Sequence, residues 1–378
     1  MNDLESHICL NLIPGIGPIK VNYLTEIFGS AGAIFKQSAK SLRSVEGIGP
    51  KLAELLVSGP RNYNPEAELR LVEQAGVRLI SRSCPEYPEL LKHIPDPPLV
   101  LYVKGDVSAL DKPNNSIALV GSRRPSYYGL EMAASLSVSA SAANWSTVSG
   151  LALGIDTAVH KATVDAAGTT IAVLGSGLGH LYPQENISLA REICDKGAVI
   201  SEFPMTYPPD KRSFPMRNRI ISGMSRGTLV VEAGLKSGTM ITSGQALEQG
   251  RTVFAVPGRA NQPHSRGCHS LIRDGAILIE SFADVLEEYH NILLVDLPES
   301  RQNSGLSEKK ENLPALLELT LSETEQKILE FLSEGDAAID TIVEKLQLTV
   351  GKVLTTLLQM ETKRLVKPLP GRRYALRK

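Results

Sequence analysis

Residues 228–244 read TLVVEAGLKSGTMITSG, and this stretch has a strand–turn–helix pattern that indicates the fold class. An apolar run of strand length, 228–232, is followed by a glycine turn and by residues that start a predicted helix. Working outward, further strand-length runs are predicted at 116–120, 146–149, 170–175, 198–203, 252–258 and 276–280. Helical patterns lie between most of them, at 129–143, 155–167, 186–196, 217–225, 238–249 and 267–274. This alternation predicts an α/β domain whose parallel sheet is covered on both faces.

Changes in composition divide the chain further. Short helical patterns surround two similar turns near the start, LIPGIGPIK (12–20) and VEGIGPKLA (45–53), and a proline-rich stretch with a strand-like run at 99–105 leads into the α/β block. Near the end, a polar segment precedes helical patterns at 322–333, 338–346 and 349–361 and a basic, hairpin-like terminus. The predicted segments are a helix–hairpin–helix (SAM-like) domain (1–60), the α/β domain (61–290), a linker (291–312) and a winged-helix-like domain (313–378).

Composition limits the classes of protein and partner. The chain has 378 residues with 40 basic and 41 acidic side chains, a net charge of -1, so any surface that binds anions must be local. Its four cysteines form no CxxC pair, which is typical of a reducing compartment. The sequence has neither a secretory pattern at its start nor an apolar run near the ~18 residues that span a bilayer. We therefore expect a cytoplasmic protein without membrane segments.

Glycines and arginines follow the predicted strands, at the edge where parallel α/β sheets bind ligands. Gly121, Ser122 and Arg123 follow the first of these strands, Ser149 and Gly150 lie at the end of the second, and Ser237, Gly238 and Thr239 come after the fifth. The segment FPMRNRIISG (214–223) adds Arg217, Asn218 and Arg219. Backbone N–H groups, helix N-termini and guanidinium groups together favour a phosphate site, although any single glycine can also serve only a tight turn.

The spacing of these motifs limits the classes of ligand that the site can bind. The dinucleotide fingerprint GxGxxG is absent, because residues 175–180 read GSGLGH, and so is the P-loop GxxxxGK[ST]. Repeated arginines suit the phosphates of a polymer better than a nicotinamide cofactor. The two GIG turns (15–17 and 47–49), followed by Lys20 and Lys51, are similar to helix–hairpin–helix turns that expose N–H groups to nucleic-acid phosphate. A helical module without nucleic-acid binding is the alternative for this region.

Several ordered motifs together resemble one family. They are VGSRRPS, VSGLALGID, VLGSGLGHLYP, ISEFP, FPMRNRIISG, VVEAGLKSGTMIT, ALEQGR and VFAVPG, all within residues 60–290. This set is similar to the DprA/Smf family of bacterial DNA-processing proteins. The resemblance implies an extended Rossmann-like, doubly wound, mostly parallel sheet. It also implies a homodimer without catalytic residues, metal or cofactor that binds and protects single-stranded DNA during natural transformation and loads the RecA recombinase. The single-strand-binding protein is a further partner that it allows.

The resemblance also implies a set of DNA-binding residues. They are Gly121, Ser122, Arg123, Ser149, Gly150, Lys161, Gln184, Arg217, Asn218, Arg219, Lys236, Ser237, Gly238 and Thr239. Gln184 is a departure, since family members often have lysine after the Tyr-Pro pair, and Lys161 or Lys236 is expected to compensate for the lost charge. Each lost phosphate contact lowers the salt dependence of binding by a little less than one unit of slope.

Two other functions and some isolated residues compete with this interpretation. The segment 230–242 is similar to an edge of lysine-decarboxylase-like phosphoribohydrolases, so a nucleotide-cleaving enzyme is the alternative. Separately, Asp156 and Glu232 at the predicted crevice edge are a candidate acid/base pair. We expect instead that Asp156 accepts backbone N–H bonds and that Glu232 pairs with an arginine. A sequence-specific transcription factor rests on the basic end alone (363–378). A metal site at His264, Cys268 and His269 is disfavoured, and Trp145 is predicted to be buried.

Overall fold

The computed structural model of the protein describes residues 1–111, 115–295, 323–333, 335–346, 352–353, 356–357, 360, 366–369 and 373–376. The chain forms two compact units, Met1–Pro298 and Glu299–Lys378. The predicted linker lies outside the described residues from residue 296 onward. Among the described residues, no helix has both the length and the apolar character needed to cross a membrane.

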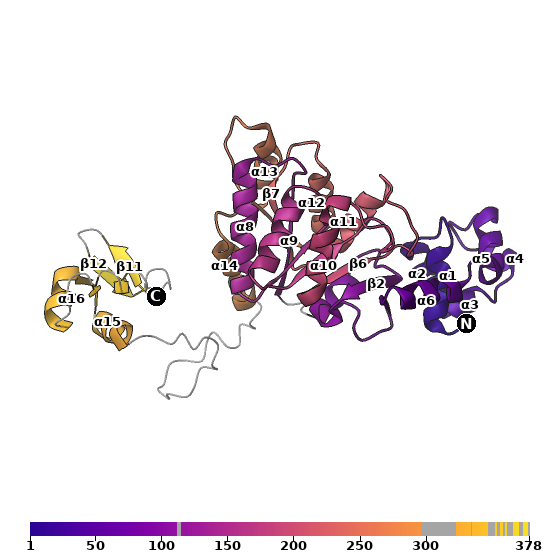
Figure 1. Ribbon diagram of the computed structural model, residues 1–378, viewed down its shortest axis with the longest axis horizontal. Helices are drawn as coiled ribbons and strands as arrows, with labels where there is room; N and C mark the ends of the chain where they lie inside the picture. Colours follow the sequence, from indigo (N-terminus) through magenta and orange to yellow (C-terminus); the bar gives the residue numbers. More distant parts are fainter. Residues whose placement is uncertain are drawn as a thin grey trace. The chain divides into compact units, whose positions relative to one another are not determined.

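A large mixed sheet organises the first unit (Figure 1). Its strands, in spatial order, are β1 (Arg78–Ser81), β2 (Val100–Gly105), β6 (Ala198–Ser201), β5 (Thr170–Val173), β4 (Ser146–Ser149), β3 (Ser116–Gly121), β7 (Gly227–Glu232), β8 (Thr252–Ala255) and β9 (Ile277–Leu278). The strands from β6 to β9 are parallel, whereas β1 and β2 pair antiparallel at one edge. The predicted α/β class with a doubly wound, mostly parallel sheet is confirmed.

Alternation along β3 shows why both faces are covered. Ile117 and Leu119 pack on one face with α8 (Tyr127–Ala142), α9 (Ile155–Asp165) and α14 (Phe282–Val295). Ala118 and Val120 pack on the other face with α11 (Ser213–Gly223), α12 (Gly238–Glu248) and α13 (Arg266–Arg273). A strand buried on both sides is a continuous apolar run, as its sequence predicted. Trp145 is buried as predicted and lies edge-on to Phe282, with 5.7 Å between the ring centroids.

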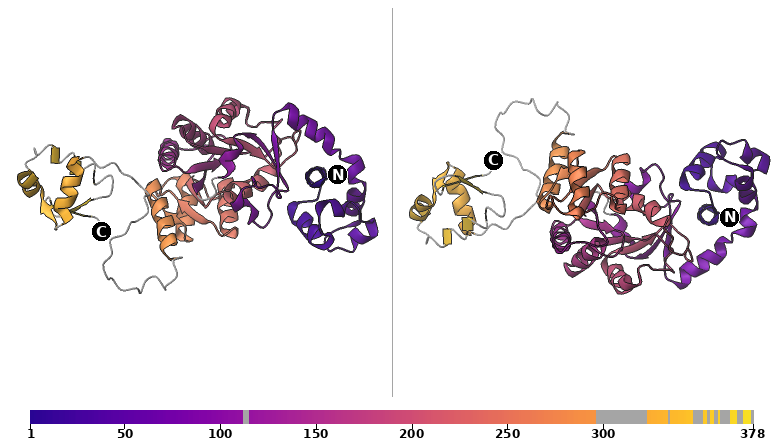
Figure 2. Two further views of the ribbon diagram at one scale, coloured as in Figure 1. Left: turned by 90° about the horizontal axis from the view of Figure 1, so that it is seen from below. Right: turned by 90° about the horizontal axis from the view of Figure 1, so that it is seen from above.

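The N-terminal helices have a core of their own beside β2 (indigo in Figure 2). They are α1 (Asp3–Leu12), α2 (Pro18–Phe28), α3 (Ala31–Ile34), α4 (Ala39–Arg43), α5 (Pro50–Asn62) and α6 (Pro65–Gln74). The Asn11 side-chain amide donates to the Glu202 carbonyl at 2.9 Å, and the Glu68 carboxylate accepts from the Met205 N–H at 2.6 Å. These buried bonds join the helices to the sheet, and the predicted domain boundary at residue 60 stays a prediction.

The proline-rich stretch holds more regular structure than its sequence suggested. It contains α6, β1 and α7 (Glu89–Lys92), which we did not predict. Prolines in this stretch start helix α6 at Pro65 and precede α7 at Pro88, positions where a missing N–H costs nothing.

A short helix of the α/β block, α10 (Ile187–Lys196), packs against β5 and β6 on the same face of the sheet as α9. Its bounds are close to the predicted range.

The second unit contains the predicted wing. Helices α15 (Glu323–Ser333) and α16 (Ile339–Leu346) accompany a small antiparallel sheet in the order β10 (Ala337–Ala338), β12 (Arg373–Leu376), β11 (Val366–Leu369). Ile328, Ile342 and Leu357 are among its buried core residues. Most of the predicted third helix (349–361) and much of the basic end (363–378) lie outside the described residues.

Candidate functional site

A cavity of about 590 Å³ opens at the carboxyl edge of the sheet, above β3 and β7. The strand order reverses direction at this point. The strands that follow β3 in the chain, β4 to β6, lie on one side of it, and β7 lies on the other side. Ligands of open α/β sheets bind in the crevice at such a switch point. The walls come from the turn after β3, the first turns of α12 and buried or half-buried residues of α11.

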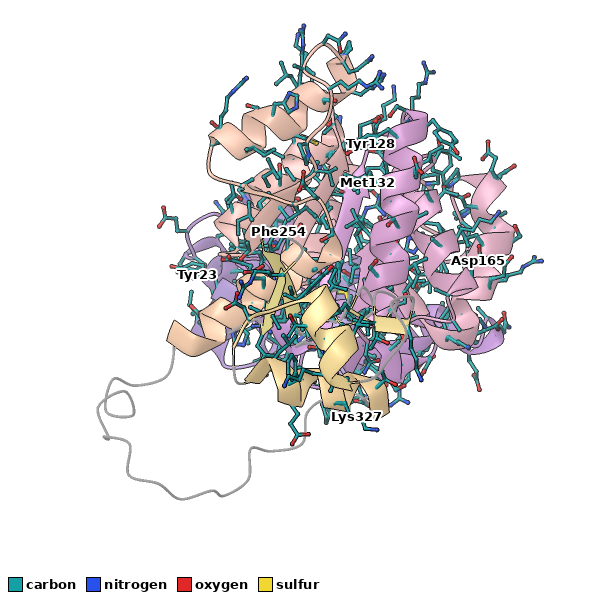
Figure 3. All side chains as sticks on the ribbon, turned by 90° about the vertical axis from the view of Figure 1, so that its left-hand side faces the viewer. Tyr23, Tyr128, Met132, Asp165, Phe254 and Lys327 are labelled. Carbon is teal, nitrogen blue, oxygen red and sulfur yellow. The ribbon has the colours of Figure 1, made fainter. Side chains whose placement is uncertain are left out.

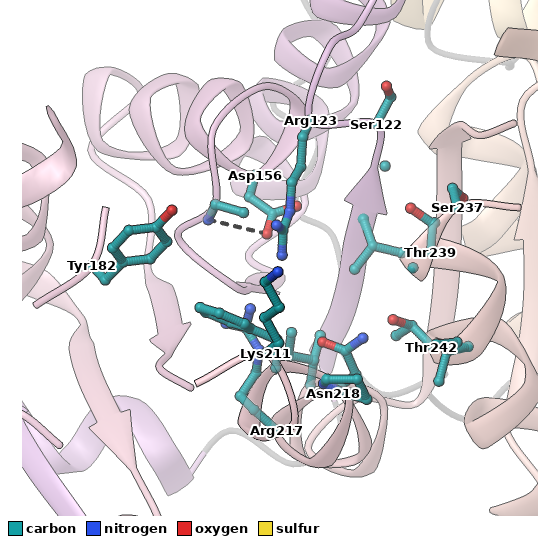
Figure 4. A pocket seen from close by; sticks show the side chains of 18 residues that line it. Ser122, Arg123, Asp156, Tyr182, Lys211, Arg217, Asn218, Ser237, Thr239 and Thr242 are labelled. Carbon is teal, nitrogen blue, oxygen red and sulfur yellow. Dashed lines mark hydrogen bonds between the residues drawn. The ribbon is translucent and has the colours of Figure 1, made fainter. Parts of the chain in front are cut away.

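Two cationic side chains converge in this cavity. Figure 4 shows Arg123, from the turn after β3, and Lys211, just before α11, extending toward each other from opposite walls. Both side chains are exposed, and the Arg123 guanidinium lies over the ring of Phe214, 5.3 Å from its centroid. Like charges in this arrangement repel each other until an anion lies between them. The geometry therefore favours a phosphate-sized anion.

A third cation, Arg217, lies under the floor of the cavity. Its side chain is only 3% exposed, and its Nη1 donates to the carbonyl of Gly150 at 2.5 Å and to that of Val173. Burial lowers the pKa of Arg217 to about 10, the nearby Asp156 carboxylate opposes that shift, and Arg123 adds to it. The guanidinium still carries its charge at neutral pH. It adds a positive field to the floor without reaching solvent.

Asp156, in the first turn of α9, holds the turn after β4. Its Oδ2 accepts from the N–H of Gly150 at 3.1 Å and from the N–H of Ala152 at 3.3 Å. Burial raises the pKa of Asp156, while Arg217 and these two N–H groups oppose the rise. The prediction that Asp156 accepts backbone N–H bonds is confirmed. Lined by three cations and this one carboxylate, the cavity is net positive although the chain is not.

The start of α12 supplies the opposite wall. Ser237, Gly238 and Thr239 line the cavity, and Ser237 is the N-cap residue, although its side chain makes no capping bond. Its buried Oγ has no hydrogen-bond partner in the described part of the chain. A helix N-terminus with free N–H groups and an unpaired hydroxyl favours an anion.

The predicted site residues divide into two groups. Those that line this cavity or a neighbouring one of about 200 Å³ are Gly121, Ser122, Arg123, Gly150, Arg217, Asn218, Ser237, Gly238 and Thr239. Neither of these cavities is lined by Ser149, Lys161, Gln184, Arg219 or Lys236. Ser149 is buried, and its Oγ donates to the Leu119 carbonyl at 2.7 Å. Lys161, Gln184 and Lys236 are exposed, and their contact with DNA stays a prediction.

Arg219 is the clearest correction. Its Nε donates to the Asp96 carboxylate at 2.8 Å and its Nη2 to the Glu202 carboxylate at 2.7 Å, with the side chain buried. Residues two apart on a helix point in different directions, so Arg217 and Arg219 cannot share a site. Burial works to lower the pKa of Arg219, but the two carboxylates raise it overall. We therefore assign Arg219 a structural role.

Glu232 also differs from expectation, since no arginine pairs with it in the described structure. Its Oε1 accepts from the Ser126 N–H at 3.0 Å, and His264 Nδ1 lies 3.9 Å from the same oxygen. Cys268 is buried, and the His269 ring nitrogen Nε2 lies 3.0 Å from the Gly258 carbonyl. The described residues contain no group of three or more His, Cys, Asp and Glu side chains arranged to hold a metal ion.

Sequence reasoning missed Lys211 and Tyr182. Lys211 lies in a loop two residues before the start of α11, where no periodic pattern assigns a direction to a side chain. Tyr182 lines both cavities, and its ring centroid lies 5.7 Å from that of Phe214. Tyr182 lies within the motif HLYP (180–183), which indicated that this loop contributes to the site, but we predicted the contact at Gln184 instead.

The two GIG turns of the N-terminal helices also come together. Gly15, Gly47, Gly49, Lys20 and Lys51 line one cavity of about 420 Å³. The helix–hairpin–helix assignment of this region stays a prediction. Whether it binds nucleic acid stays a prediction.

Comparisons with known proteins identify the family. Residues 78–290 match the family model described as DNA recombination-mediator protein A, and residues 312–372 match the DprA winged helix domain. Protein Smf of Synechocystis is 35% identical over 97% of this chain and 96% of its own length. DNA processing protein DprA of Bacillus subtilis is 45% identical over 67% of this chain and 80% of its length.

Solved structures agree with the sequence comparison. The X-ray structure of DprA from Streptococcus pneumoniae has a TM-score of 0.66 at 34% identity and covers 76% of this chain and 98% of that one. DprA from Helicobacter pylori, whose structure is described for its single-stranded DNA binding mode, has a TM-score of 0.50 at 30% identity over 58% of this chain and 96% of that one. The chain therefore belongs to the DprA/Smf family of DNA-processing proteins.

Proposed function

We propose that this protein binds the sugar–phosphate backbone of single-stranded DNA in the cavity between β3 and β7. The observation that carries the proposal is the convergence of Arg123 and Lys211 over the buried Arg217. Free N–H groups and the Ser237 hydroxyl at the start of α12 complete an anion site on the opposite wall. The relative from H. pylori, described as binding single-stranded DNA, supports the same ligand here.

A polymer suits the site better than one small anion. Arg123 also lines the neighbouring cavity with Arg124, Tyr182 and Phe214, so cationic lining continues beyond a single phosphate position. Tyrosine and phenylalanine rings offer stacking surfaces for unpaired bases, which a duplex does not expose. Binding through the backbone and through stacking is only weakly selective for sequence. We expect mixed and homopolymer strands to differ in affinity by less than about tenfold.

We further infer that the bound strand is passed to a recombinase of the RecA type, with the protein acting in the cytoplasm as a homodimer and not as an enzyme. The description of the matching family model as a recombination mediator supports the handover. A dimer would hold two segments of one strand and so raise its avidity. Light scattering after size exclusion at micromolar concentration should give twice the monomer mass, and a strict monomer contradicts this part.

The test of DNA binding compares substitutions inside and outside the cavity. Arg123→Ala and Lys211→Ala should each weaken binding of a labelled single strand severalfold at moderate salt. Each should also lower the slope of log K against log salt by about 0.7, because each removes one phosphate contact. Lys196→Ala removes an exposed charge at the end of α10, outside both cavities, and should change neither quantity. Unchanged binding in both cavity variants overturns the proposal, provided that their melting temperatures match the wild type.

The enzyme alternative requires two acidic groups at one reacting bond. Asp156 lines the cavity with Arg123, whereas Glu232 lines a different cavity, and this separation supports a binding role. Nucleoside monophosphates incubated with the protein should release no free base. Base release that disappears in the Glu232→Gln variant would favour the hydrolase instead.

A further inference from the structure

A second large cavity lies beside the first along the same sheet edge. Its volume is about 640 Å³, and its walls come from the start of α8, the last residue of β7 and the segment after β8. The three cavities follow the strand order. The small one is lined by the turn after β4, the one with Arg123 by the end of β3 and the start of α12, and this one by the end of β7 and the segment after β8. Arg123 and Ser126, only three residues apart, line adjacent cavities.

We propose that this second cavity receives one unstacked nucleobase that carries an exocyclic amino group. The base belongs to the strand whose phosphates lie between Arg123 and Lys211, so the proposal rests on the DNA binding proposed above. Tyr127 provides the stacking surface, Glu232 accepts a hydrogen bond from the amino group, and Arg259 at the rim attracts the next phosphate.

Tyr127 has the exposure of a stacking surface rather than of a core residue. It is 83% exposed although it is a large aromatic residue in the first turn of α8. The adjacent Tyr128 is held in place, because its hydroxyl donates to the Pro257 carbonyl at 3.0 Å. Figure 3 shows Tyr128 at the end of α8, with Met132 one turn further along the helix. An exposed ring beside a fixed wall can take up the face of a base, and such stacking is worth ~1–3 kcal/mol per base.

Glu232 supplies the polar end of the cavity. It is only 5% exposed, and both of its oxygens accept from Ser126, Oε1 from the N–H at 3.0 Å and Oε2 from the hydroxyl. A methyl group at position 129 would lie 2.7 Å from Oε2, so Gly129 allows the carboxylate to stay in this position. The His264 Nδ1 atom lies 3.9 Å from Oε1. The carboxylate can therefore accept further hydrogen bonds from the cavity.

An ionised carboxylate accepts hydrogen bonds and donates none, which gives the cavity a preference among bases. The N4 amino group of cytosine can donate a hydrogen bond to the Glu232 carboxylate, whereas thymine has the O4 carbonyl, a hydrogen-bond acceptor, at the same position. Thymine therefore leaves the buried carboxylate opposite another acceptor. We expect oligo-dC to bind severalfold more tightly than oligo-dT, within the weak selectivity expected for the whole site.

The first experiment separates bases from backbone. Tyr127→Ala should weaken binding of a labelled oligo-dC at least about fivefold, as expected for one lost stacking contact. Binding of an abasic strand with the same number of phosphates should not change. Leu130→Ala, an exposed neighbour on α8 that does not line the cavity, is the matched control and should behave as wild type. Equal losses for both strands, or no loss for either, overturn the proposal.

The second experiment tests the carboxylate. Glu232→Gln keeps the shape but adds an amide donor, so the preference for oligo-dC over oligo-dT should vanish or reverse. If the Glu232→Gln variant keeps the wild-type melting temperature and still prefers oligo-dC to the same extent, another residue causes the preference. That result overturns the proposed role of Glu232. These outcomes differ from failure of the proposed function. If wild-type protein binds the abasic strand and Arg123→Ala does not weaken that binding, the phosphate site itself is wrong.

Discussion

At the residue scale, the motif RNR (217–219) shows how a helix separates identical side chains. Arg217 turns toward the sheet and lies under the cavity floor, whereas Arg219 turns away to Asp96 and Glu202. Both arginines are buried, but only one lies close enough to the cavity to act on an anion through its field. In our proposal, the exposed cations Arg123 and Lys211 make the direct contacts with the strand.

The ion pairs of Arg219 lead to a stability prediction. Arg219→Met should lower the free energy of unfolding by about 3–5 kcal/mol, because Glu202 is then buried without a partner. Urea denaturation measures this loss. Strand affinity per folded molecule should not change. The double variant Arg219→Met with Glu202→Leu should recover much of the stability, and no recovery would indicate that Arg219 contributes through packing instead.

His160 makes stability depend on pH. Burial lowers its pKa to about 3 in the folded protein, with a further contribution from Arg217, against an ordinary value of 6.5. Below pH 6.5 the unfolded chain binds a proton at His160 that the folded chain does not bind. The contribution of neutral His160 to stability is therefore fully present above pH 6.5 and declines as the pH falls toward 3. Between pH 6.5 and 5 this group should cost about 2 kcal/mol.

Denaturation of wild type and His160→Phe at pH 7.5 and at pH 5 checks this prediction. The stability of wild type relative to the variant should fall by about 2 kcal/mol between the two pH values. A constant difference would mean that His160 already titrates normally in the folded protein. Any other titrating group acts on both proteins and cancels in the comparison.

At the element scale, the site depends on how closely the turns after β3 and β4 approach. Gly154 begins α9 with a φ of 89°, and a Cβ there would lie 2.4 Å from the Ser122 carbonyl oxygen. The Ile155 N–H donates to that same oxygen at 3.1 Å. The turn that carries Arg123 is therefore fixed by the first residues of α9, and not by its own sequence alone.

Replacing this glycine should disturb both fold and binding. Gly154→Ala should cost about 3 kcal/mol or more and weaken strand binding, because the new methyl group pushes Ser122 and Arg123 apart from α9. Gly250→Ala is the matched control, since Gly250 also has a positive φ (67°) but open space around it. It should cost about 1 kcal/mol through backbone strain and leave binding unchanged. Equal effects in the two variants would contradict a steric role for Gly154.

At the scale of the whole molecule, the cavities along the sheet edge all belong to the first compact unit. No described residue of Glu299–Lys378 lines them. The C-terminal unit has its own core and its own sheet. We therefore expect the proposed single-strand binding to need the first unit alone.

Truncation tests this separation. A chain of residues 1–298 should fold cooperatively and bind a labelled single strand within about twofold of the full chain, because it keeps every phosphate contact. Fluorescence anisotropy at one fixed salt concentration measures the affinity. A large loss on truncation would place the main strand contacts in the basic end and revive the transcription-factor alternative.

From the sequence alone, most elements of the α/β block could be predicted, as could the edge of the sheet at which the cavities lie. Apolar runs such as 116–120 and 228–232 were fixed as buried strands because parallel strands are apolar on both faces, and glycines marked the turns at their carboxyl ends. The sequence also determined that Arg217 and Arg219 diverge, since both belong to a predicted helix, although we did not use that constraint. The antiparallel pair β1 and β2 was harder to predict, because short apolar runs separated by prolines are also typical of a connecting loop.

Which charged side chains meet depends on how distant parts of the chain pack together. Lys211 comes 88 residues after Arg123, and the expected compensating lysines, Lys161 and Lys236, lie outside the cavities. Likewise, Asp96 and Glu202 neutralise Arg219 from distant parts of the chain. Local periodicity assigns a side chain to a face of its own element, but a charge cluster depends on how separate elements pack, and that information is absent from any single stretch of sequence.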